Sequence, residues 1–193
     1  MTWLVAGLGN PGPRYAKNRH NLGYLVVDEL ASRAGERFRK VRFVPADVAE
    51  MKHEGERVLL AKAHAYMNES GPAFASLARK HHVPPEQVIV VHDEIDLGFG
   101  ALRIKFGGST AGHNGVRSVA AALRIPEFFR VRLGVGRPPG RKEAADWVLE
   151  DFAKAELPEV AILVDDGADA TLSLVTDGLE VTQDRYNRSA PRD

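Results

Sequence analysis

Short apolar runs alternate with amphipathic helical patterns along this chain, and this alternation limits its possible folds more than any other feature. Residues 3–7 and 88–91 are continuously apolar, which is typical of strands buried on both faces of a sheet. After the first run, Leu22, Val26 and Leu30 have helical spacing, and Gly35 is expected to end that helix. Strands that alternate with helices predict an α/β fold.

The remaining elements continue this pattern. Residues 41–51 and 58–61 are expected to form a hairpin across the polar turn at 53–56. The later helices are expected around residues 74–78, over 116–123 and over 157–174.

The length of the chain fits one domain. Its 193 residues, 44% of them hydrophobic, can bury one sizeable core, so we expect a single domain over 1–182 and a polar tail over 183–193 that frays. No cysteine is present, which excludes disulfides, thiolate metal sites and a cysteine nucleophile. No apolar run approaches the ~18 residues of a membrane span, and no charged n-region of a secretion signal precedes the first strand. We therefore expect a cytoplasmic protein without a membrane partner.

Polar side chains gather just after four of the apolar segments. These clusters are Asn10 with His20 and Asn21; Tyr66, Met67 and Asn68; His92, Asp93, Glu94 and Asp96; and His113 with Asn114. Loops at strand ends of an α/β sheet carry functional sites, so we expect the clusters to converge. There Asp93 could bind one ring nitrogen of His20, fix its tautomer and make the imidazole a better base.

A dinucleotide site and a serine nucleophile fit less well. Gly7, Gly9 and Gly12 match the pattern G-x-G-x-x-G, but Pro11 and Pro13 remove N–H donors that would hold a pyrophosphate. The serine-hydrolase pattern G-x-S-x-G is missed by one position, since residues 107–111 read GGSTA.

A metal site is the other alternative. His92, Asp93, Asp96 and His113 could supply ligands, but His92 and Asp93 are neighbours on a strand and should point to opposite faces. We therefore expect no metal and no cofactor. A His–Asp pair acting on water remains, and it suits hydrolysis of a reactive acyl bond, an ester more readily than an amide.

The basic residues indicate a polyanion partner although the net charge is zero, with 26 Lys and Arg against 26 Asp and Glu. Arg103 and Lys105 share one face of an alternating strand, and Arg130 and Arg132 share one face of another. If these strands are neighbours, the four cations form a stripe; a solvated strand face would have the same pattern. The glycine-rich segment 107–115 could bind a phosphate or be a flexible connection.

Four motifs resemble the bacterial-type peptidyl-tRNA hydrolase family across nearly the whole chain. They read GLGNPGPRYAKNRHNLG at 7–23, YMNESG at 66–71, VHDEIDL at 91–97 and GGSTAGHNGVRSV at 107–119. The resemblance implies a single α/β domain with a mixed twisted sheet flanked by helices. It also implies an enzyme that cleaves the ester between peptide and tRNA in peptidyl-tRNA and so recycles prematurely released tRNA in translation and ribosome rescue. Relatives in plant organelles serve in RNA splicing, so the alternative is an RNA-binding protein without activity on the same scaffold.

The resemblance also assigns roles. His20 resembles the general base, Asp93 the carboxylate that orients it, and Asn10 the contact near the scissile ester. Positions that resemble the peptide and tRNA-end cleft are Tyr15, Tyr66, Asn68 and Asn114, with His113 beside the last. Lys105 and Arg132 resemble residues that bind the tRNA backbone. Asn18 departs from the family, which commonly has threonine there, and we expect a local loop adjustment. The expected partner is peptidyl-tRNA, with no DNA, and the expected state is a monomer.

Overall fold

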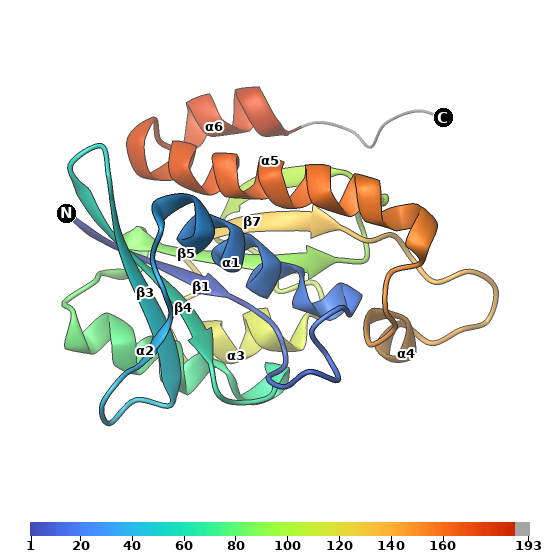
Figure 1. The fold of residues 1–193 in the computed structure, drawn as a ribbon, viewed down its shortest axis with the longest axis horizontal. Helices are drawn as coiled ribbons and strands as arrows, with labels where there is room; N and C mark the ends of the chain where they lie inside the picture. Colours follow the sequence, from blue (N-terminus) through green and yellow to red (C-terminus); the bar gives the residue numbers. More distant parts are fainter. Residues whose placement is uncertain (188–193) are drawn as a thin grey trace.

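A mixed, twisted seven-stranded sheet runs through the middle of the molecule, with helices on both faces (Figure 1). The computed structural model describes residues 1–187. The strand order is β2-β3-β4-β1-β5-β7-β6. The strands are β1 (Thr2–Gly7), β2 (Arg39–Lys40), β3 (Ala46–His53), β4 (Glu56–Ala63), β5 (Val88–Glu94), β6 (Leu102–Phe106) and β7 (Phe129–Gly134). β1 is parallel to β4 and β5, and β5 is parallel to β7, whereas β2, β3 and β6 pair antiparallel with their neighbours.

Each face of the sheet carries its own hydrophobic core, which explains why the central strands are apolar at every position. On β1, Trp3 and Val5 pack in the core under α1 and α5, while Leu4 and Ala6 pack in the core over α2 and α3. All four side chains are buried. A strand covered on both faces therefore shows a continuous apolar run instead of an alternating one.

The predicted helices, α1, α2, α3 and α5, begin and end near the expected positions, whereas α4 and α6 were not predicted. They are α1 (Leu22–Ala34), α2 (Gly71–Lys80), α3 (Asn114–Leu123), α4 (Ala144–Val148), α5 (Leu157–Thr176) and α6 (Leu179–Tyr186). Gly35 ends α1 in the left-handed conformation at φ 69°, as predicted. None of the helices in the described part is both long and apolar enough to cross a membrane.

The start of α1 lies directly against the ends of β1 and β5. A Cβ atom on Gly23 would overlap with the carbonyl oxygen of Val91 and with the amide nitrogen of Leu8. Only a glycine permits this approach. It places the residues just before α1 beside the carboxyl end of β5.

Two expectations about element boundaries are wrong. The strand expected over 41–51 begins only at Ala46, because residues 41–45 form a turn with Phe43 at φ 65° and Pro45 before the strand. Residues 183–186 of the expected frayed tail belong to α6. There Gln183 and Asn187 hydrogen-bond the backbone of Ile104 and so cover the free edge of β6. The rest of that tail, 188–193, lies outside the described residues.

Candidate active site

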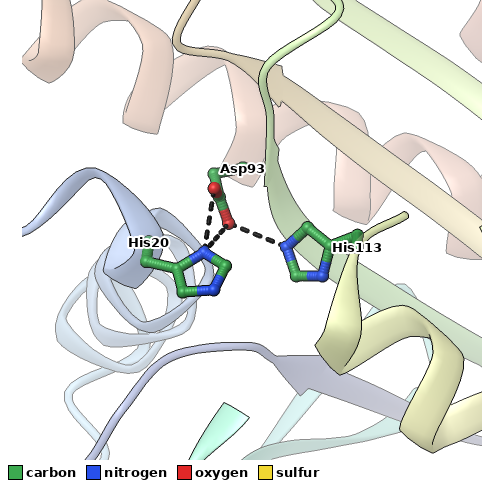
Figure 2. A group of neighbouring side chains, drawn as sticks. All are labelled: His20, Asp93 and His113. Carbon is green, nitrogen blue, oxygen red and sulfur yellow. Dashed lines mark hydrogen bonds and ion pairs between the residues drawn. The ribbon is translucent and has the colours of Figure 1, made fainter. Parts of the chain in front are cut away.

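His20 and Asp93 meet at the carboxyl end of β5. His20 lies in the short 3₁₀ turn Arg19–Asn21 before α1, and Asp93 is the penultimate residue of β5. The Nδ1 atom of His20 lies 2.9 Å from Oδ1 and 3.0 Å from Oδ2 of Asp93 (Figure 2). The pair predicted from the sequence is therefore formed.

His113 is a second partner of the same carboxylate, on the side opposite His20 (Figure 2). Its Nε2 atom lies 2.9 Å from Oδ1 of Asp93. Its Nδ1 atom accepts hydrogen bonds from the amides of Gly115 and Val116 and so caps α3. Because Nδ1 accepts, the proton of the neutral ring is on Nε2 and is donated to Asp93. The sequence placed His113 in the cleft but did not predict this bond.

The two imidazoles keep Asp93 ionised. Burial alone would raise its pKa, but the nearby His20 and His113 and their hydrogen bonds hold the pKa well below the usual value. For His20, burial lowers the pKa, whereas the charge and hydrogen bond of Asp93 raise it, and the net result lies above the ordinary 6.5. The carboxylate thus holds Nδ1 of His20 and strengthens its ring as a base.

The amide of Asn10 is oriented by two neighbours. Asn21 accepts from the backbone amide of Asn10 and donates to its carbonyl, both at 2.9 Å. The backbone amide of Met67 donates to Oδ1 of Asn10 at 2.8 Å. Because Oδ1 is occupied, the side-chain NH₂ of Asn10 is the group that can donate to a ligand.

These side chains line one cavity of about 390 Å³. Every site residue predicted from the sequence lines it except Lys105 and Arg132. The rings of Tyr15 and Tyr66 lie 6.1 Å apart, edge to face. The sequence did not predict the apolar side of the cavity, which is formed by Ile95 and by residues of α4 and its end, namely Ala144, Ala145, Val148 and Leu149.

The cavity offers no unpaired carboxylate among its lining residues. Asp93 accepts from two histidines. Glu94, the other acidic residue in the lining, accepts from the backbone amide of Asp96 at 3.1 Å and forms an ion pair with Arg132 at 3.3 Å. A ligand therefore meets hydrogen-bond donors and apolar surface.

The donor atoms of His20, Asp93 and His113 lie within 4.8 Å of one another, close enough to consider a metal ion. The hydrogen bonds do not suit one, because the ring nitrogens that face Asp93 carry protons and Nδ1 of His113 is occupied by backbone amides. In the set considered from the sequence, Asp96 instead pairs with Arg137. The geometry is that of a hydrogen-bonded network.

The predicted pairing of the two strands that carry the basic stripe is confirmed, but the prediction that all four cations lie on the surface is wrong for Arg130. β6 and β7 are antiparallel neighbours, with Arg103 opposite Arg132 and Lys105 opposite Arg130. Arg130, however, is only 1% exposed and donates to the carbonyl of Ser109. Strand alternation could not show that the loop at 107–112 covers this position.

Arg19, which was not predicted, ties the turn that carries His20 to a distant segment. Its guanidinium lies 3.6 Å from the ring centroid of Trp147 and pairs with Glu156 at 3.0 Å. Asn18, the departure from the family pattern, donates to Asp151 at 2.6 Å. These contacts hold α4 and the following segment against the cavity.

Comparison with known proteins identifies what the chain is similar to. A sequence model described as peptidyl-tRNA hydrolase matches residues 4–193. The chain is 55% identical over 180 residues to the peptidyl-tRNA hydrolase of Mycobacterium sp. (strain KMS), covering 93% of this chain and 94% of the relative. The corresponding protein of Frankia alni is 52% identical over 185 residues, covering 96% and 93%.

Solved structures agree with this similarity. The crystal structure of peptidyl-tRNA hydrolase from Acinetobacter baumannii superposes with a TM-score of 0.91 at 30% identity, covering 99% of this chain and 97% of that chain. A 5′-methylthioadenosine nucleosidase from Arabidopsis thaliana has a TM-score of 0.51 at 12% identity over 92% of this chain and 98% of that chain, which shows a similar fold only.

Proposed function

This chain belongs to the peptidyl-tRNA hydrolase family and hydrolyses peptidyl-tRNA, and from this premise we propose how its residues perform the reaction. The observation that carries the proposal is the bifurcated hydrogen bond from Nδ1 of His20 to both carboxylate oxygens of Asp93, at the wall of the cavity. The predicted alternative, an RNA-binding protein without activity, finds no support in these relatives, which are hydrolases.

His20 acts as the general base. Its Nδ1–H is donated to Asp93, so the lone pair of Nε2 is available in the cavity. Nε2 takes a proton from water as the water oxygen attacks the ester carbonyl. The tetrahedral intermediate then collapses, the bond to the ribose oxygen breaks, and that oxygen receives the proton. Such positioned proton transfer contributes roughly 10²–10⁴-fold.

Asn10 donates to the substrate near the scissile carbonyl. Its free NH₂ group is held in place through Met67 and Asn21, so it needs little reorganisation during the reaction. A donor that hydrogen-bonds the carbonyl oxygen as negative charge develops on it raises kcat by about 10²–10³-fold. Asn68, Asn114, Tyr15 and Tyr66 line the same cavity and bind the peptide and the tRNA end.

The paired carboxylates favour N-blocked substrates. A free aminoacyl group would bring an ammonium into a cavity where Asp93 and Glu94 are both engaged. Desolvating an unpaired charge is costly, whereas a peptide bond is neutral. Selectivity therefore follows from the absence of an available anionic partner in the lining.

Lys105 on β6 and Arg132 on β7, both members of the basic stripe, bind the tRNA backbone. We propose that the protein acts as a monomer in the cytoplasm, where it returns tRNA from prematurely released peptidyl-tRNA to translation.

Release of peptide from an N-acetylaminoacyl-tRNA tests this proposal, with the unblocked aminoacyl-tRNA as control and EDTA in a parallel sample. We expect fast, EDTA-resistant cleavage of the blocked substrate alone. Loss of cleavage in EDTA would contradict the mechanism. Folded protein that binds tRNA without cleaving it would favour the RNA-binding alternative.

A further inference from the structure

Arg130 is a buried cation, and a contribution to the stability of the fold does not explain its burial. Its side chain on β7 is 1% exposed, and it forms no ion pair with any described residue. Its Nη2 atom has no hydrogen-bond partner in the described part of the chain. Burying an arginine without a carboxylate is unfavourable compared with an apolar residue of similar size. We therefore expect Nε and Nη1, the two donor atoms that do have partners, to have a role other than stabilising the fold.

Those donors contact two segments that flank the catalytic carboxylate. Nε of Arg130 donates to Nε2 of His92 at 3.3 Å, and Nη1 donates to the carbonyl of Ser109 at 2.5 Å. Nδ1 of the fully buried His92 in turn donates to the backbone carbonyl of Asp93 at 2.7 Å. Ser109 lies in the loop that leads to His113, the second partner of Asp93.

We infer that Arg130 is a positioning residue of the active site, which holds Asp93 from both sides. Through His92 it fixes the backbone of Asp93, and through Ser109 it fixes the loop whose His113 binds the carboxylate. This inference rests on the proposed function, in which Asp93 orients His20. This role explains why Arg130, unlike the other cations of the basic stripe on β6 and β7, is buried beneath the loop at 107–112.

The charge of Arg130 adds to the effect of its hydrogen bonds. His92 can accept from Arg130 only while its Nε2 is unprotonated. Burial, His113 at the start of α3 and Arg130 on β7 lower the pKa of His92 well below its ordinary value, against the opposing effect of Asp93 on β5. Burial and Arg132 lower the pKa of Arg130 itself, against the opposing charge of Glu94 on β5, to about 10, so that it stays charged at neutral pH. Burial is the largest of these causes, and the charge of Arg130 adds to it in keeping His92 in the neutral form that the network requires.

Two substitutions separate these contributions. Arg130→Lys keeps the charge and loses the fork of donors, whereas Arg130→Gln keeps donors and loses the charge. For both we expect kcat on N-acetylaminoacyl-tRNA to fall about 10-fold or more, because small displacements of catalytic groups have large effects on rate, with KM changed less than about 3-fold. In Arg130→Gln the loss should grow as the pH falls, because one of the causes that lower the pKa of His92 is removed, although burial and His113 still lower it. Arg130→Lys should keep the wild-type shape of the pH profile.

The controls are Arg132→Gln, which should raise KM with a smaller change in kcat, and the surface substitution Arg33→Gln, which should leave both unchanged. Unchanged kcat in folded Arg130 variants would overturn the inference. A loss confined to KM would also overturn it, since Arg130 would then act on RNA binding.

A measurement on the unmodified protein avoids any folding defect of the variants. Nitrogen-15 NMR of the histidine rings should show His92 neutral with its proton on Nδ1, and a proton on Nε2 would overturn the inference. Wild-type protein that fails to cleave peptidyl-tRNA would contradict the proposed function instead. The histidine spectrum needs no activity and would still decide whether this network exists.

Discussion

Asn21 forms two hydrogen bonds with the backbone of Asn10, one through each end of its side-chain amide. The residue next to the proposed base thus positions the proposed substrate donor, although eleven positions separate them in sequence. Base and donor are therefore built as one unit from the loop before α1.

Replacing Asn21 with aspartate tests this unit. The aspartate keeps the size of the side chain and the acceptor for the Asn10 amide, but places a carboxylate oxygen against the Asn10 carbonyl. We expect kcat to fall by about 10²-fold, the effect of losing a positioned donor. Steady-state kinetics with N-acetylaminoacyl-tRNA would measure it. The kcat of Asn21→Ala should fall less than that of Asn21→Asp, because alanine creates no repulsion with the Asn10 carbonyl. Equal kcat values for Asn21→Asp and the wild type would show that the orientation of Asn10 does not affect the reaction.

Removing the imidazole of His20 should leave a protein that still binds tRNA but hydrolyses peptidyl-tRNA far more slowly. We expect His20→Ala to lower kcat by roughly 10²–10⁴-fold. Binding of tRNA, measured separately by fluorescence titration, should be largely unchanged because the basic face lies on β6 and β7. Turnover at the wild-type rate would exclude His20 as the base.

The pH profile should report the His20–Asp93 pair. Only unprotonated His20 can accept a proton, and its pKa lies above 6.5, so kcat should fall as the pH drops through a value above 6.5. Asp93→Asn removes the charge that raises this pKa while burial continues to lower it. The acidic limb should therefore move to lower pH, and the plateau should fall because the tautomer is no longer fixed. A limb that stays in place would show that another group controls it.

The salt dependence of tRNA binding should separate the partly exposed cations Lys105 and Arg132 from the buried Arg130. Removing a cation that binds one phosphate should reduce the slope of log K against log salt by about one unit. We expect this for Lys105→Gln and Arg132→Gln but not for Arg130→Gln, because Arg130 is buried. Similar slopes for all three variants would show that Arg130 reaches the RNA.

Gly23→Ala should destabilise the fold by about 3 kcal/mol, since the new Cβ would collide with the backbone at Val91 and Leu8. Gly167→Ala is the matched control, because it also lies in a helix but meets only side chains, at 3.0 Å and beyond. It should change the free energy of unfolding by less than about 1 kcal/mol. Urea unfolding of both variants measures the difference, and equal stabilities would refute the close approach of α1.

Much of this structure follows from local pattern. The continuous apolar runs of β1 and β5 and the spacing of Leu22, Val26 and Leu30 predicted the layers, and the polar residues after those runs predicted the meeting of His20 and Asp93. The paths of loops are not local. The burial of Arg130, the bond from His113 to Asp93 and the packing of α6 on β6 depend on where distant segments cross, and no periodicity records that.

The carboxylates of the cavity also determine which small molecules it would accept. Asp93 is buried with its oxygens engaged by two histidines and Glu94 is paired with Arg132, so an amine would find no accessible carboxylate oxygen there and would lose its hydration. A screen of chemical fragments against this cavity should therefore return neutral amides and flat hydrogen-bond acceptors, and inhibitors developed from them would carry no basic group at the end that enters the site.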